Sequence, residues 1–125
     1  MLCRGIRGAI VAPANTRQAI LDSTRELMEA LIAANDVQPG DVASVFFTTS
    51  PDLTAEYPAL AARELGWLDA ALLCNVDIAV PTGLARCIRV LIHWNTEKRP
   101  DEIIHCYLGE AERLRPDRAR ANLPA

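Results

Sequence analysis

The chain has 125 residues, half of them hydrophobic, with a formal net charge of −3 and an isoelectric point near 5.3. This length suits one domain with its own core, and the acidic balance argues against a protein that binds nucleic acid through a basic face. No apolar run approaches the roughly 20 residues of a membrane-spanning helix and the first residues lack the order of a signal peptide, so we expect a cytoplasmic protein without membrane contact.

The first half of the chain predicts a strand, a helix and a second strand. Residues 2–12 predict a strand that contains two glycines, which allow another segment to approach its backbone closely. A helix follows to about Asn35, capped by Asn15 or Thr16, because apolar residues recur at helical spacing. The run 42–49 is rich in β-branched and aromatic residues, which favours a strand.

The second half predicts one short helix and three more strands. An alanine-rich helix over 59–65 follows Pro58 and ends at Gly66. The remaining strands are expected at 70–76, 86–94 and 103–108. The tail from residue 109 is charged and ends in small residues, and we expect it to be mobile.

This order of elements predicts the fold class. A β-α-β-α-β-β-β chain forms a single α/β or α+β domain over residues 1–125, with a mixed sheet and helices on one face. The other face of the sheet also carries apolar residues. We therefore expect a symmetric oligomer that covers it.

The cysteines and histidines predict neither a disulfide framework nor a metal site. No C-x-x-C pair occurs, and His93 and His105 lie in no cluster with the spacing of metal ligands. We expect the four cysteines to be small buried hydrophobic residues. They are Cys3, Cys74, Cys87 and Cys106.

Isolated arginines are the strongest chemical signal. Of the 13 basic residues only Lys98 is a lysine. Arg4, Arg7, Arg89 and Arg115 stand in apolar, glycine-bounded or proline-bounded surroundings. The arginine side chain is a permanently charged fork that binds carboxylates through paired hydrogen bonds. This pattern indicates a small polyanionic ligand, of which a dicarboxylate is the simplest.

Short motifs along the chain resemble a known family. The motifs are Arg4-Gly5-Ile6-Arg7-Gly8-Ala9, Pro51-Asp52-Leu53, Tyr57-Pro58-Ala59, Ala62-Arg63, Cys87-Ile88-Arg89-Val90, Tyr107-Leu108 and Leu114-Arg115-Pro116-Asp117. In this order they resemble the monofunctional AroH-type chorismate mutases, from residue 3 to about 118. The resemblance implies a homotrimeric pseudo-α/β-barrel with active sites at subunit interfaces. It also implies the rearrangement of chorismate to prephenate, on the route to phenylalanine and tyrosine, without a metal or cofactor.

The resemblance implies a role for each of five polar residues. Arg89 matches the group that hydrogen-bonds the ether oxygen of chorismate, and Arg7 and Tyr107 match groups that bind its carboxylates. Arg115 matches a tail arginine that closes over the bound substrate. Asp77 stands where the family has a glutamate that accepts a hydrogen bond from the ring hydroxyl, and it is one methylene shorter.

The other expected substrate-binding residues lie just before or within the predicted helix over 59–65 and within the predicted strand over 70–76. They are Tyr57, Ala59, Arg63, Leu73 and Cys74. Tyr57 replaces the family's usual phenylalanine, and Leu60 replaces a lysine found in some relatives.

Two other functions remain open at this point. One is an imine deaminase of the Rid type, and the other is a non-catalytic binding module for an aromatic metabolite.

Overall fold

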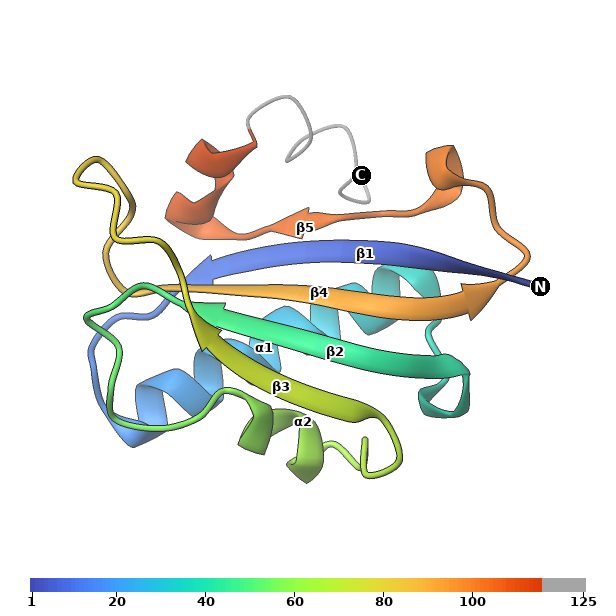
Figure 1. Ribbon diagram of the computed structural model, residues 1–125, viewed down its shortest axis with the longest axis horizontal. Helices are drawn as coiled ribbons and strands as arrows, with labels where there is room; N and C mark the ends of the chain where they lie inside the picture. The colour runs from blue at the N-terminus through green and yellow to red at the C-terminus, as the bar shows by residue number, and fades with distance from the viewer. Residues whose placement is uncertain (116–125) are drawn as a thin grey trace.

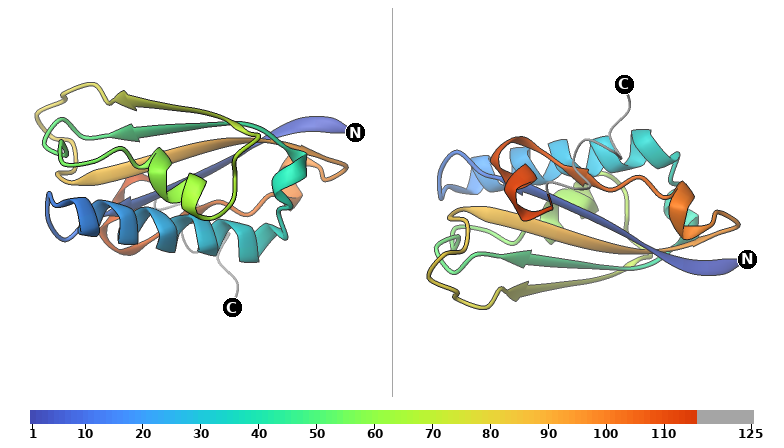
Figure 2. Two further views of the ribbon diagram at one scale, coloured as in Figure 1. Left: turned by 90° about the horizontal axis from the view of Figure 1, so that it is seen from below. Right: turned by 90° about the horizontal axis from the view of Figure 1, so that it is seen from above.

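The computed structural model describes residues 1–115, in which a five-stranded mixed sheet carries both α-helices on one face (Figures 1 and 2). The elements are β1 (Leu2–Val11), α1 (Arg17–Asn35), η1 (Pro39–Asp41), β2 (Val42–Thr49), α2 (Ala59–Glu64), β3 (Ala71–Val76), β4 (Cys87–Thr96), η2 (Pro100–Glu102), β5 (Cys106–Tyr107) and η3 (Gly109–Leu114). The strand order is β3-β2-β4-β1-β5. β4 runs antiparallel to β1 and β2, and the outer strands β3 and β5 run parallel to their neighbours. The predicted fold class is confirmed.

The long helix begins and ends at residues of the expected kind. Thr16 is the cap, and its side-chain oxygen accepts a hydrogen bond from the Ala19 N–H at 3.1 Å. The helix ends at Asp36, whose φ of 56° lies in the left-handed region. Asn15, the alternative predicted cap, instead accepts hydrogen bonds from the backbone N–H groups of residues 54 and 55, which ties the loop after β2 to the start of α1. No helix among residues 1–115 is long and apolar enough to cross a membrane.

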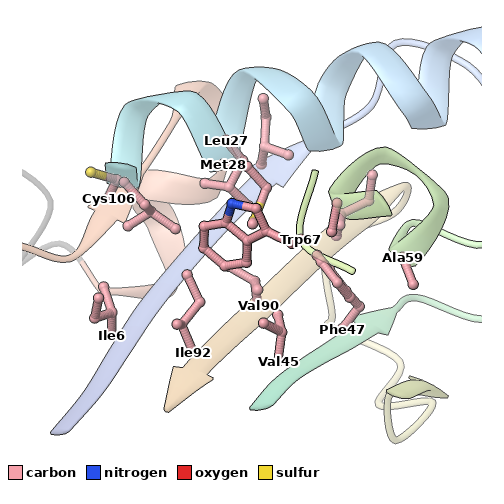
Figure 3. Packing of buried hydrophobic residues seen from close by; sticks show 14 of the residues in the cluster. Ile6, Leu27, Met28, Val45, Phe47, Ala59, Trp67, Val90, Ile92 and Cys106 are labelled. Atoms are coloured by element: carbon pink, nitrogen blue, oxygen red, sulfur yellow. The ribbon is translucent and has the colours of Figure 1, made fainter. Parts of the chain in front are cut away.

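The core lies between the sheet and α1. Figure 3 shows the indole of Trp67 between the helix and the strands, near Met28 and Val90. Trp67 is 2% exposed, and Phe47 and Ile92 are fully buried. Burial of such side chains stabilises the fold by about 1.5–3 kcal/mol each. The sheet is therefore held to α1 mainly by apolar packing.

One of the two glycines of β1 is required by close packing. A Cβ on Gly8 would lie 2.9 Å from a methyl of Leu31 and 3.0 Å from the carbonyl oxygen of Cys106. A Cβ on Gly5 would meet only Leu91, at an ordinary 3.4 Å. The predicted close approach to the backbone thus occurs at Gly8, where α1 and β5 both reach the strand.

The last strand is shorter than the sequence predicts. Only Cys106–Tyr107 pairs with β1, within the predicted range 103–108. Pro100–Glu102 turns into a short 3-10 helix. The buried side chain of Asn35 then takes both backbone groups of Ile104: its Nδ2 donates to the carbonyl and its Oδ1 accepts from the N–H, each at 2.8 Å. Because the amide uses these groups, the backbone there does not join the sheet.

The first six residues of the predicted tail form a short helix. Gly109–Leu114 forms a 3-10 helix that packs on β1 and buries Ala111. η3 thereby covers the small hydrophobic cluster around Tyr107, and the mobility expected of the tail stays a prediction. Residues 116–125 lie outside the described part of the chain.

Candidate active site

The register of the sheet places two predicted arginines on its open face. Successive side chains of a strand point to opposite faces. Arg89 pairs with Ala9 on one side and Thr48 on the other, and Arg7 pairs with Leu91. Arg7 and Arg89 consequently share the face turned away from the helices.

These arginines border a cavity of about 330 Å³. The predicted site residues that line it are Arg7, Asp77, Arg89, Tyr107 and Arg115. They come from β1, β4, β5, the residue just after β3 and the residue just after η3. The structure thus brings together all five polar residues to which the sequence assigned a role.

A two-point ion pair holds Arg89 in the cavity. Its Nε donates to Asp77 Oδ2 at 3.1 Å and its Nη2 donates to Asp77 Oδ1 at 3.0 Å. The hydrogen bonding of Arg89 to the Asp77 carboxylate is the main reason why the pKa of the guanidinium lies above its usual value. Asp77 is itself held, because its backbone N–H donates to the Thr49 carbonyl at 2.8 Å, one step beyond the end of β3. The pair takes two of the five N–H donors of Arg89 and leaves three for a ligand.

Tyr107 is fixed by packing. Its side chain is 4% exposed and lies in a small cluster with Ala9, Cys87 and Ala111. Burial raises the pKa of the Cys87 thiol to about 11, so this neighbour stays uncharged near neutral pH. The phenol therefore borders the cavity from a rigid, apolar support.

Two other predicted residues, Tyr57 and Cys74, line part of a separate cavity of about 390 Å³ near α2 and β3. The Ala59 N–H and the Arg63 charge both act to lower the pKa of the Cys74 thiol, but burial is the largest influence and raises it. Cys74 therefore remains a neutral thiol, and Tyr57 stays 70% exposed. The structure does not bring this group to the cavity around Arg89.

Leu73 belongs to neither cavity in this chain. It pairs with Phe46 on the open face, whereas its neighbour Cys74 packs against the core on the helix face. The alternation of strand side chains thus separates two adjacent residues that were expected to share one site. Arg4, one of the isolated arginines, does not line the cavity around Arg89, and its Nε donates to the Lys98 carbonyl at 3.0 Å.

Six apolar or small residues of the first cavity were not predicted. They are Phe46, Thr48, Leu91, Leu114, Gly8 and Val90. The first two occupy alternate positions of β2, and Leu91 lies two residues after Arg89. A period of two in the predicted strands would have indicated these three, because they share the face of Arg89.

The histidines serve as hydrogen-bond partners within the sheet. His93 Nδ1 lies 2.7 Å from Ser44 Oγ, and His105 Nδ1 accepts a hydrogen bond from the Arg7 N–H at 2.9 Å. Among residues 1–115 no group of three or more histidine, cysteine or acidic side chains is arranged to hold a metal ion.

Comparison with known proteins gives one consistent result. Residues 3–118 match the family described as chorismate mutase type I. The chorismate mutase AroH of Thermus thermophilus is 46% identical over 117 residues, which span 93% of this chain and 96% of that protein. The AroH enzyme of Bacillus subtilis is 41% identical over 118 residues, or 94% of this chain and 93% of that enzyme. A solved chorismate mutase from Clostridium thermocellum superposes with a TM-score of 0.85 at 40% identity, covering 87% of this chain and 97% of the other. These relatives give no support to an imine deaminase or to a non-catalytic binding module.

Proposed function

This chain belongs to the type I chorismate mutase family and isomerises chorismate to prephenate, a step toward the aromatic amino acids, and we propose that the cavity around Arg89 is the catalytic half of its active site. The observation that carries the proposal is the two-point contact of Asp77 with Arg89, in a cavity that Arg7, Tyr107 and Arg115 also line.

Arg89 acts on the bond that breaks. In this rearrangement the ether C–O bond breaks as a new C–C bond forms within the same molecule, so no proton, electron or group leaves the substrate. Negative charge grows on the ether oxygen in the transition state. A fixed guanidinium beside that oxygen stabilises the transition state more than the ground state, which is the condition for raising the rate.

The other polar residues hold the substrate in its reactive shape. Arg7, Tyr107 and Arg115 bind the two carboxylates, and this restricts the flexible substrate to the compact conformation in which the reacting carbons meet. Each carboxylate oxygen accepts more than one hydrogen bond. Asp77 can therefore orient Arg89 and accept a hydrogen bond from the ring hydroxyl at the same time.

The second half of the site comes from another copy of the chain in a homotrimer. Two observations support this assembly. Tyr57 and Cys74 line a different cavity from Arg89, so one copy does not surround the substrate with both groups. Large apolar side chains are also exposed on β3 and after it, and such a patch typically marks an interface. They are Leu73, Val76, Ile78 and Val80.

A cytoplasmic location is part of the same proposal. All four cysteines, which lie within residues 1–115, are free thiols. Free thiols suit a reducing compartment.

Mixing two impaired variants tests the two-half site. Arg89→Ala damages the first half, and Arg63→Glu places a repelling charge on an exposed position of the second half. If a site forms between copies, subunit exchange in the mixture creates some sites with both halves intact, so turnover of chorismate exceeds that of either variant alone. Arg25→Glu, also on a helix surface, is the control partner for Arg89→Ala. Its own trimers have normal activity. This mixture should therefore show only the activity that the same amount of Arg25→Glu protein has alone. Turnover that never exceeds the sum of the two separate variants would contradict an interface site.

A further inference from the structure

The edge between β1 and β5 contains an unusual hydrogen bond close to the catalytic cavity. The Arg7 backbone N–H donates to Nδ1 of His105 at 2.9 Å, and the imidazole is 6% exposed. An imidazole nitrogen accepts a hydrogen bond only when it carries no proton. The bond therefore assigns the neutral tautomer of His105 with its proton on Nε2.

This bond takes the place of a backbone hydrogen bond that is missing between β1 and the segment before β5. The Ala9 carbonyl accepts a hydrogen bond from the Leu108 N–H at 2.9 Å, so Ala9 and, two residues earlier, Arg7 turn their backbone groups toward β5. The backbone of Ile104 is taken by the Asn35 side chain. The ladder consequently stops at Cys106, and the His105 ring supplies the acceptor that the backbone does not.

The same bond links the two segments that carry Arg7 and Tyr107 to the cavity. Arg7 is the donor, and Tyr107 lies two residues after His105. We propose that His105 is a positioning residue, whose Nδ1 fixes the backbone of Arg7 and the register of Tyr107 so that both reach the substrate carboxylates. The proposal rests on the carboxylate-binding role given to Arg7 and Tyr107 above.

The expected effect is on binding more than on the chemical step. Arg7 and Tyr107 contact carboxylates that carry their charge throughout the rearrangement, so these contacts act on substrate and transition state alike. Loss of such contacts raises KM and changes kcat less. The net contribution of one hydrogen bond corresponds to a change of up to about tenfold.

Two variants of the same shape separate the hydrogen bond from simple packing. In His105→Asn the side-chain oxygen sits two bonds beyond Cβ, as Nδ1 does, and can accept from the Arg7 N–H. His105→Leu has the same branching without an acceptor. We expect His105→Asn to keep KM within about twofold of the parent enzyme, and His105→Leu to raise KM about tenfold with kcat changed less than about threefold. Circular dichroism, the thermal midpoint and the oligomeric state establish that both variants are folded.

The outcomes distinguish this proposal from the one on which it rests. If Arg7→Ala raises KM but His105→Leu does not, His105 has no positioning role. If Asn and Leu variants lose affinity equally, ring packing rather than the acceptor is responsible, and the proposal is again overturned. If Arg7→Ala itself leaves KM unchanged, the carboxylate-binding role given to Arg7 is contradicted, and with it the positioning role of His105 that rests on it. Should His105→Leu not fold, His105→Gln replaces it, because the glutamine amide lies one bond further from the backbone than the asparagine amide. A KM of His105→Gln equal to that of His105→Asn would then overturn the proposal.

Discussion

Replacing Asp77 should separate catalysis from stability. The carboxylate contacts Arg89 at 3.0 and 3.1 Å, but 49% of the Arg89 side chain is exposed. Ion pairs that are this open to solvent typically stabilise a fold by less than about 1 kcal/mol. A hydrogen bond to a charged group within the site is worth about 1.5–3 kcal/mol, and 1.4 kcal/mol corresponds to tenfold in rate. Asp77→Ala should therefore lower kcat/KM by at least about tenfold while the free energy of unfolding changes by less than about 1 kcal/mol.

The assay combines chorismate turnover with urea denaturation on the same preparations. Asp77→Asn keeps the shape but loses the charge and one acceptor, so its activity should fall between those of the parent and Asp77→Ala. Glu64→Ala breaks a comparable surface ion pair, with Arg25 at 3.4 Å, and should change neither quantity. A large loss of stability with unchanged kcat/KM in Asp77→Ala would refute the reasoning, because the pair would then be structural.

Three further predictions concern the rest of the fold. Gly8→Ala should lower the free energy of unfolding by about 1–3 kcal/mol, since its Cβ would collide with α1 and the backbone of β5; equal urea midpoints would contradict this. A hydrogen bond from Ser50 is the main cause that lowers the pKa of Asp52, so this carboxylate stabilises the fold above about pH 4 and loses that effect as the pH falls through its folded pKa. The stability difference between the parent and Asp52→Asn should accordingly shrink in acid, and a difference independent of pH would count against it. Burial and a pKa of about 11 should keep Cys87 unreactive toward a thiol reagent at pH 8 until the protein unfolds, whereas the exposed Cys3 reacts at once; equal rates for the two would be inconsistent with the structure.

Local patterns were sufficient for most of the fold. The cap at Thr16, the strand over 42–49 and the break at Gly66, whose φ is 94°, are properties of neighbouring residues, and each appears where it was predicted. Such local patterns could not predict that β5 is shorter than the range 103–108. The shortening depends on a contact between Asn35 and Ile104, which are 69 residues apart in the sequence.

The site shows the same limit. Motif resemblance identified Arg7, Asp77, Arg89, Tyr107 and Arg115, and the strand register brings them to one cavity. The resemblance did not indicate that Tyr57 and Cys74 line a different cavity of the same copy, nor that Leu73 and Cys74 take opposite faces of β3. The resemblance also did not indicate the hydrogen bond from the Arg7 N–H to His105, because these residues are 98 positions apart in the sequence.

The most direct test of the account is the turnover of chorismate by Arg89→Ala, followed as the loss of substrate absorbance. Removal of a single group that stabilises charge in the transition state typically lowers kcat by about 100-fold to 1000-fold. We expect a loss of at least about 100-fold for this variant in a folded protein, with Arg25→Ala, on the surface of α1, unchanged. A kcat within about threefold of the parent enzyme would contradict the central role of Arg89.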